Sequence, residues 1–300
     1  MSDAQFHLDP NRRHDAVLLF DVVDGNPNGD PDAGHLPRID PETMQGLVSD
    51  VAVKRKVRDW VDATRGKTER YKIYVQHGAF LADKQERAFS AKGLKKGDKS
   101  QKTQQSAQDW MCANFFDVRA FGAVMGVSDY RAGQVRGPVQ VTFARSIDPI
   151  VTLDMSIARV ALTNAAEARE AVEGDEESTH GTFGRKAMVP YGLYRAHLFV
   201  NPHFGVHTGF DAEDLAVLWE SLERMWDLDR SASRGMTACR GLVVFSHESP
   251  LGNAPAHKLF DRVVVERHPE VAVPRAFAQY RVTTDDRDLP PGVTLTTLVG

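Results

Sequence analysis

The residues of this chain that are best suited to chemistry lie in two glycine-containing loops beside basic side chains. The first loop, residues 24–40, is dense in Gly, Pro, Asn and Asp, and it includes Asn28. The helix expected after it carries four cations on its solvent face, Lys54, Arg55, Lys56 and Arg58. Loop N–H groups and a helix start can both point at an anion, so this region predicts a phosphate-binding edge. Lys54 and Arg58, four residues apart on one face, could straddle one phosphate.

The second loop, residues 230–236, has the sequence RSASRGM and lies between an expected helix and an expected strand. Its small residues let a polyanion approach the backbone, and its arginines can neutralise phosphate. We therefore predict that Arg234 and Gly235 contribute to binding, with an ordinary helix-to-strand turn as the alternative. The edge of the first strand, the basic helix and this turn are expected to converge into one cationic furrow that holds a ribose-phosphate backbone.

A third group of cations and aromatic rings begins at residues 183–186, FGRK, and continues with Tyr191 and Tyr194. This mixture suits single-stranded RNA, whose bases stack on rings while its phosphates meet Arg and Lys. Arg185 and Lys186 are therefore candidate RNA-binding residues. The two tyrosines, taken alone, could instead form a buried pair in a sheet.

Two patterns in the first loop could hold a metal ion. Residues 24–29 match the opening of a calcium-binding loop, but His35 stands where the glutamate at the twelfth position is required. A turn-forming role for these residues is favoured. A magnesium ion for nuclease chemistry could use the nearby acids Asp21, Asp24, Asp30 and Asp32. No separated acid completes a recognisable two-metal set.

The remaining motifs favour neither a metal nor a cofactor. His197, His203 and His207 have spacings that could suit zinc, but their segment reads as a glycine-containing loop, so hydrogen-bonded histidines are favoured. The sequence contains no GxSxG, P-loop or GxGxxG motif, so hydrolase, NTPase and dinucleotide-binding functions lack support. We expect a protein with no catalytic residues, no metal and no cofactor.

The composition is that of a globular protein, with 300 residues, 42% hydrophobic and 26% charged. A net charge of −4 argues against a free-standing, non-specific nucleic-acid binder. Charge is nevertheless segregated, since residues 84–102 are rich in lysine and residues 167–177 in glutamate; two solvated insertions are the alternative. Cys112 and Cys239 belong to no CxxC pair, and no apolar run reaches about 18 residues. We therefore expect a cytoplasmic protein without a membrane span.

Hydrophobic patterns predict the elements that must position these residues. Strands are expected at residues 16–23, 71–76, 139–144, 191–200 and 241–246. Helices are expected after Ser49, around residues 106–116 and after Asp211, and residues 92–107 read as a loop or the edge of a subdomain. The main elements follow the ferredoxin-like βαββαβ order, which predicts an antiparallel sheet with both helices on one face. Residues 66–135 and 163–186 are then insertions.

Several blocks of sequence resemble one known family when they are taken in order. They are NPNGDPD, LPRID and SDVAVKRKVRDWV near the N-terminus, then FFDVRAFGAVM, RGPVQVTFARSIDPI, FGRKAMVPYGLYRAH and SPLGNAPAHKLFDRV. Together they resemble the RNA-binding backbone subunit of CRISPR Cascade complexes, in the RAMP superfamily. The type I-C backbone family is the most similar.

The resemblance implies a hand-like α+β protein with an RRM-type, ferredoxin-like palm, a helical finger insertion and a β-hairpin thumb. The implied boundaries are a palm at 14–65, 136–162 and 187–285, fingers at 66–135, a thumb at 163–186 and a C-terminal tail at 286–300. Lys54 and Arg58 match the family's basic first helix, and Arg234 and Gly235 match its glycine-containing loop. The acidic thumb departs from what nucleic acid would require, so its tip is expected to contact a neighbouring subunit.

The resemblance also implies a function. Such a subunit binds CRISPR guide RNA, polymerises with other copies of itself and presents the guide to target DNA in antiviral defence. Its other partners are the capping RAMP subunit and the large and small Cascade subunits, and it has no catalytic activity. The alternative is a RAMP-type endoribonuclease that processes guide RNA or cuts target RNA with Asp24, Asp30 or Asp32.

Overall fold

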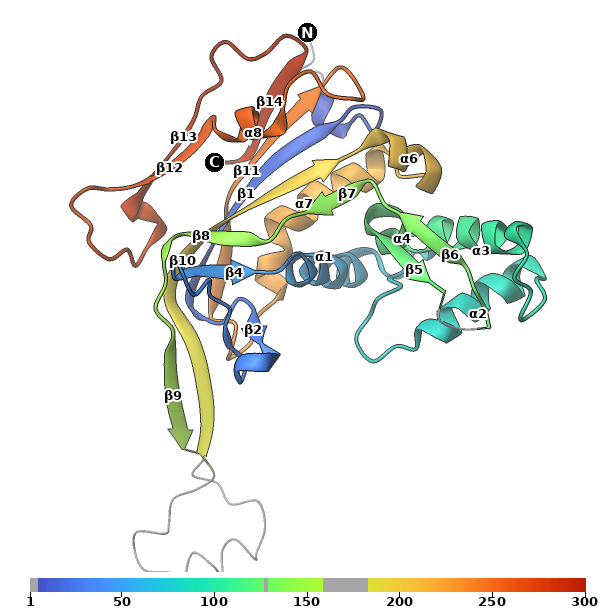
Figure 1. The fold of residues 1–300 in the computed structure, drawn as a ribbon, viewed down its shortest axis with the longest axis horizontal. Coiled ribbons are helices and arrows are strands. Elements are labelled where there is room, and N and C mark those ends of the chain that lie inside the picture. The colour runs from blue at the N-terminus through green and yellow to red at the C-terminus, as the bar shows by residue number, and fades with distance from the viewer. Residues whose placement is uncertain (1–4, 127–128, 159–182) are drawn as a thin grey trace, which may run out of the picture.

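The computed structural model describes residues 5–126, 129–158 and 183–300. Its centre is an antiparallel sheet in which three long strands lie side by side (Figure 1). These are β1 (His14–Gly25), β10 (Phe183–Val200) and β11 (Met236–His247). The strand order is β14-β11-β1-β10-β8-β4, completed by β14 (Val293–Val299), β8 (Ala144–Pro149) and β4 (Gln45–Val48). β7 (Val139–Val141) and β9 (Leu153–Ala158) also pair with β10.

Two amphipathic helices cover one face of this sheet. α1 (Asp50–Arg65) begins at Ser49, whose Oγ accepts a hydrogen bond from the Ala52 amide at 3.3 Å. α7 (Ala212–Leu228) begins at Asp211 with a reciprocal capping box. The apolar stripes of both helices enter one core with the inward side chains of β1, among them Leu18 and Phe20. Both predicted helices and their caps are confirmed.

The predicted strands and helices of this layer occur in the predicted order, but the sheet also contains strands that were not predicted: β4 between β1 and α1, β8 and β9 between β7 and β10, and β14 after β11. The protein is therefore a mixed α/β fold built on an antiparallel sheet. The other sheet face packs against α8 (Ala256–Phe260) and the hairpin of β12 (Val263–Arg267) and β13 (Tyr280–Thr284). Residues 286–300, expected as a tail, instead contain β14, which is hydrogen-bonded to β11.

A helical unit with its own core lies beside the sheet (Figure 1). It contains α2 (Leu81–Lys92), α3 (Gln101–Asn114), α4 (Phe116–Phe121), β5 (Gly122–Met125) and β6 (Gly133–Arg136). Two predictions in this region are wrong. Residues 71–76 do not form a strand, because Tyr71 ends a 3-10 helix and Lys72 forms an isolated β-bridge. The helix α3 begins within residues 92–107, where no helix start was expected. α2 was not predicted because its sequence is too polar to show a helical stripe.

A buried ion pair fastens the helical unit to α7. The Arg119 guanidinium donates to both carboxylate oxygens of Asp214, at 2.8 and 2.7 Å, and both side chains are fully buried. Arg70 donates to the same carboxylate at 2.8 Å. Because removing one partner of a buried pair leaves an unpaired charge, these contacts hold the unit in a fixed place.

A two-stranded arm extends from the sheet (Figure 1). β9 pairs with the first residues of β10 in the register Leu153↔Met188 to Ala158↔Phe183. The arm therefore begins ten residues before the predicted thumb at 163–186. Residues 163–182 of that prediction, with the acidic run, lie outside the described residues.

Shorter elements complete the described chain. They are η1 (Phe6–Leu8), β2 (Gly29–Asp30), η2 (Pro31–Ala33), β3 (Leu36–Pro37), η3 (Glu69–Tyr71), α6 (Pro202–Thr208) and η5 (Phe277–Gln279). β2 and β3 form a small hairpin inside the first loop. Across the residues described, every helix is too short or too polar to cross a membrane.

Candidate nucleic-acid interface

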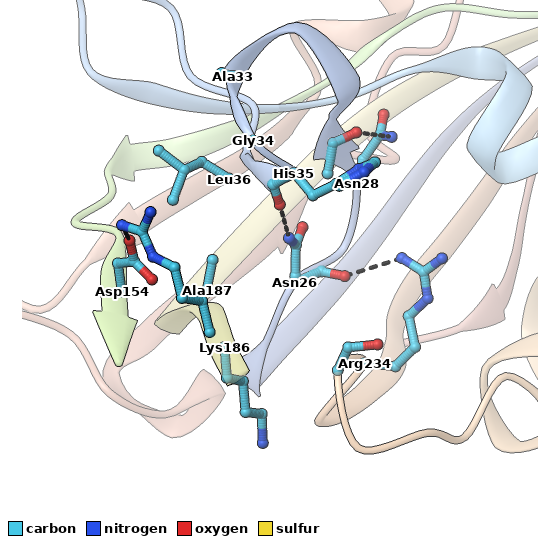
Figure 2. Close-up of a pocket in the computed structure, with 13 residues that line it drawn as sticks. Asn26, Asn28, Ala33, Gly34, His35, Leu36, Asp154, Lys186, Ala187 and Arg234 are labelled. Carbon is cyan, nitrogen blue, oxygen red and sulfur yellow. Dashed lines mark hydrogen bonds and ion pairs between the residues drawn. The ribbon is translucent and has the colours of Figure 1, made fainter. Parts of the chain in front are cut away.

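Three segments that are far apart in sequence enclose a pocket of about 440 Å³ (Figure 2). They are the first loop from Asn26 to Leu36, the base of the arm, and the turn at Ser233 and Arg234. Four of the residues predicted to bind RNA line this pocket: Asn28, Arg185, Lys186 and Arg234. The two loops singled out from the sequence therefore meet the two cations at the base of the arm, Arg185 and Lys186, in one pocket.

Two glycines let the end of β1 and the arginine turn touch. A Cβ on Gly25 would lie 2.0 Å from the Arg234 carbonyl oxygen. Gly235 has a φ of +60°, and a Cβ there would lie 2.3 Å from the Val23 carbonyl oxygen. The Asn26 amide donates to the Ser233 carbonyl oxygen at 2.7 Å across this contact. Gly235 thus shapes the pocket through close backbone packing.

Arg234 is held by the loop that it faces. Its Nη1 donates to the carbonyl oxygens of Asn26, at 2.9 Å, and Pro27, at 3.2 Å. Burial lowers the pKa of Arg234 below its usual value, and the charge of Arg55 lowers it further. Arg234 therefore fixes the wall of the pocket while adding positive charge to it.

Asn28 joins the same loop to the start of α1. Its Oδ1 accepts a hydrogen bond from the Ser49 amide at 2.8 Å, and its carbonyl oxygen accepts from the Arg38 amide at 3.1 Å. Both bonds orient the loop against the helix that was predicted to carry the cations. The structure therefore gives Asn28 a positioning role in the pocket wall.

Three cations surround one carboxylate where α1 meets the arginine turn. Asp229 forms ion pairs with Arg55 (Nη2 to Oδ1, 3.4 Å), Arg234 (Nε to Oδ2, 3.6 Å) and Lys56. Lys56 is buried, so its predicted place on the solvent face is wrong. Burial lowers the pKa of Lys56, and the charges of Arg234 and Arg55 lower it further. Three positive groups against one negative group leave this Asp229 cluster attractive to an anion.

Lys54 and Arg58 do not line the pocket. Arg58 Nε donates to Asp117 Oδ2 at 2.8 Å, and these side chains are 12% and 1% exposed. Lys54 pairs with Asp50 at 2.9 Å, and both cations lie over the ring of Phe121. The predicted furrow that joins Lys54 and Arg58 to Arg234 is therefore wrong. Residues 54 and 58 share a helical face that turns toward the helical unit, whereas residue 55 turns toward Asp229.

The base of the arm presents its two cations on opposite sides, because neighbouring residues of a strand alternate. Arg185 is 80% exposed and pairs with Asp154 in the pocket wall. Lys186 extends away from the first loop (Figure 2). No acidic group among the described residues forms an ion pair with Lys186.

The two tyrosines predicted to stack on bases belong to the sheet instead. Tyr194 is fully buried and stacks on Phe20 with 5.3 Å between ring centroids. The Tyr191 hydroxyl donates to Asp21 Oδ2 at 3.3 Å. Burial raises the pKa of both phenols. Both tyrosines are buried in the sheet, as the alternative interpretation required, but they belong to different apolar clusters and do not pack as a pair.

Several of the acids and histidines considered for metal binding have other partners. Asp30 accepts from the Asp32 amide at 3.2 Å and pairs with Arg38 at 3.2 Å. His197 stacks on Phe260, and burial, together with the charge of Arg195, lowers its pKa to about 4. Residues 203–207, predicted as a loop, lie in α6. In the part of the chain that the structure describes, no three His, Cys, Asp or Glu side chains gather as a metal site.

Three acids that shape this region were not predicted from the sequence. Asp154, Asp229 and Asp117 each neutralise a basic residue that the sequence marked as a binding candidate. Asp117 alone carried a signal, because it stands in the apolar run FFDVRAF, where a charge is expected only if it is paired. Asp229 lies in a polar segment and looks like an ordinary surface acid, and Asp154 lies in β9, which was not predicted.

The fold and the pocket together define a class, a mixed α/β protein with a cation-rich pocket beside an extended arm. The chain belongs to the Cas7 family, since the sequence model for CRISPR-associated protein Cas7 matches residues 12–285. A CRISPR-associated protein Cas7 from Haloferax volcanii is 45% identical over 47 residues. That match spans 16% of this chain and only 14% of the relative's length.

Solved structures with a similar chain are also complexes of CRISPR systems by their titles. A chain of "CRISPR RNA-guided surveillance complex, pre-nicking" has a TM-score of 0.49 at 14% identity, with 78% of each chain covered. A chain of "CRISPR RNA-guided surveillance complex" has a TM-score of 0.46 at 16% identity, covering 78% of this chain and 68% of that one. A chain of a Type III-B Cmr-beta complex bound to cognate target RNA has a TM-score of 0.41 at 9% identity, covering 78% and 61%.

Proposed function

We propose that this chain is a non-catalytic backbone subunit of a type I-C Cascade surveillance complex. Several copies polymerise along one CRISPR guide RNA in the cytoplasm and present it for pairing with target DNA in antiviral defence. The observation that carries the proposal is the Cas7 family match over residues 12–285. The other partners are the capping RAMP subunit and the large and small subunits of the complex.

The parts of the molecule correspond to a hand. The sheet with α1 and α7 is the RRM-type palm, the helical unit at 66–135 is the fingers, and the arm formed by β9 and β10 is the base of the thumb. The pocket then lies where thumb and palm meet. This is where an RNA strand that runs from one copy to the next would pass closest to the cations of both parts.

The chemistry of the pocket suits a ribose-phosphate backbone. Arg234 supplies charge from the Asp229 cluster, and Arg185 and Lys186 supply it from the arm, whereas Arg55 belongs to the same cluster without lining the pocket. Contacts to phosphate fix the register of a nucleic acid and carry no sequence information. A guide held in this way keeps its base edges free for pairing with target DNA, so one protein surface serves guides of any sequence.

The proposal is tested by expressing the chain with a guide RNA and examining the product by electron microscopy. We expect a regular polymer whose length follows the length of the guide. A mixture of monomers and free RNA at physiological salt would contradict the proposal.

A second measurement separates the backbone subunit from an endoribonuclease. Purified protein is incubated with labelled guide RNA, with and without Mg²⁺, and intact RNA is expected in both cases. Cleavage that disappears in Asp24→Ala, Asp30→Ala or Asp32→Ala would replace the proposed function with catalysis.

A further inference from the structure

We propose that Asp154 is an internal counter-ion that competes with an RNA phosphate for Arg185 and thereby limits how tightly the pocket holds nucleic acid. This inference rests on the RNA-binding function proposed above. It assigns to one carboxylate in the pocket wall a role opposite to that of the cations around it.

The two side chains come from different strands of the arm. The register pairs Asp154 with Ala187 and Arg185 with Ser156, so Asp154 and Arg185 are diagonal neighbours on one face of the hairpin. Both line the pocket, where the carboxylate meets the guanidinium directly (Figure 2). Any phosphate that binds Arg185 from the pocket must therefore displace this carboxylate or lie against it.

The arm side of the pocket differs in charge from the Asp229 cluster, which reaches the pocket wall through Arg234. At the Asp229 cluster three cations share one carboxylate, so positive charge remains whatever the ligand. At the arm, Arg185 and Asp154 form a pair that is neutral as a whole. An approaching phosphate is drawn to the Asp229 cluster and to Lys186 first, and Arg185 becomes available to it only when Asp154 releases the guanidinium.

The exchange is energetically accessible because the ion pair is exposed to solvent. The Arg185 side chain is 80% exposed and that of Asp154 is 27% exposed, so water screens their attraction. A phosphate offers the guanidinium two parallel hydrogen bonds and can replace the carboxylate. The carboxylate then stays nearby as a repulsive charge, which weakens RNA binding at this end of the pocket.

The test measures binding of a fluorescein-labelled single-stranded RNA of mixed sequence to the full chain, by anisotropy, over a series of salt concentrations. Asp154→Asn should tighten binding by up to about fivefold, the upper range for an exposed ion pair. The slope of log K against log salt should steepen by up to about 0.7, the value for one further phosphate of a single strand. Asp154→Ser should reproduce both changes.

The matched control is Glu266→Gln. Glu266 pairs with Arg281 at 2.8 Å on the β12–β13 hairpin, outside the pocket, so the variant makes the same change in net charge. It should leave affinity and slope unchanged. The same substitution of Asp154 in an Arg185→Gln background should give a clearly smaller gain than in the natural chain.

Each outcome decides the proposal. An unchanged or weaker affinity in Asp154→Asn, or an equal gain in the Arg185→Gln background, would overturn the counter-ion role. If the natural chain shows no salt-dependent affinity for the RNA at all, the proposed function fails instead. If Arg55→Gln weakens binding while Asp154→Asn has no effect, only the counter-ion role fails.

Discussion

The two sides of α1 carry basic residues that have different roles, one in holding the fold together and one in presenting charge to solvent. On one side, Arg58 pairs with the buried Asp117, which also accepts hydrogen bonds from the amides of Tyr74 and Val75 at 2.7 and 3.0 Å. On the other side, Arg55 is half exposed, at 49%, beside Asp229. A basic helix is therefore not a single binding surface. What distinguishes the two arginines is the number of cations on their carboxylate, because Asp117 pairs with Arg58 whereas Asp229 is shared by Arg55, Lys56 and Arg234.

The largest expected effect tests the structural side of α1. Asp117→Ala should lower the free energy of unfolding by about 3–5 kcal/mol, because it leaves the Arg58 charge and two backbone amides without partners. Urea denaturation followed by circular dichroism measures it. Asp50→Ala removes the half-exposed partner of Lys54 and should cost about 1 kcal/mol or less. Equal losses in the two variants would mean that the Arg58 side is not the anchor described.

The pKa of the buried His14 sets the pH range in which variants on the two sides of α1 can be compared. Burial lowers the pKa of His14 to about 4, from 6.5 in the unfolded chain, so the unfolded state binds more protons between these values. This contribution to stability is fully present above pH 6.5 and is lost as the pH falls toward 4, by about 3 kcal/mol at most.

Unfolding measured from pH 8 to pH 4 should show this decline, and it should be shallower in His14→Gln. A profile that stays level down to pH 4 in the natural chain would contradict the buried neutral imidazole. Binding studies of the α1 variants are best compared above about pH 7, where the contribution of His14 to stability is fully present.

Substitutions of Gly235 and Gly34 test the effect of backbone packing without changing the charge of the site. Gly235 and Gly34 both have a φ of +60°, but a Cβ on Gly34 would meet nothing within 4 Å, whereas one on Gly235 would strike the Val23 carbonyl. Gly235→Ala should therefore lower stability by about 2 kcal/mol or more, and Gly34→Ala by about 1 kcal/mol. Thermal unfolding of the two variants gives the comparison. Similar losses would show that close packing of the arginine turn is unimportant.

Local patterns in the sequence predicted the layer that supports the site. The apolar spacing of Val53, Val57 and Trp60 and the cap at Ser49 located α1, because a helix records its buried face in its own sequence. The approach of the first loop to the arginine turn was predicted, whereas the base of the arm was only a separate candidate. Arg234, predicted as an RNA-binding residue, lines the pocket.

Long-range pairing is what the sequence did not reveal. Arg58 meets Asp117 across 59 residues, and Arg55 meets Asp229 across 174. Nothing in the spacing around either arginine distinguishes a cation that is neutralised from one that is free. For the same reason Lys56 looked exposed on the helix surface, although its position in the fold buries it beside Asp229. The polar α2 lacked a stripe because it covers only the small core of the helical unit.

The most direct test of the account compares Arg55→Gln with Lys54→Gln, two neighbours on α1 that make the same change in charge. Binding of a labelled single-stranded RNA is followed by anisotropy at pH 7.5 over a series of salt concentrations. Arg55→Gln should weaken binding several-fold and reduce the salt slope by about 0.7, the value for one lost phosphate contact, while Lys54→Gln changes neither. Equal effects of the two variants, or a larger effect of Lys54→Gln, would contradict the claim that RNA meets the Asp229 side of the helix.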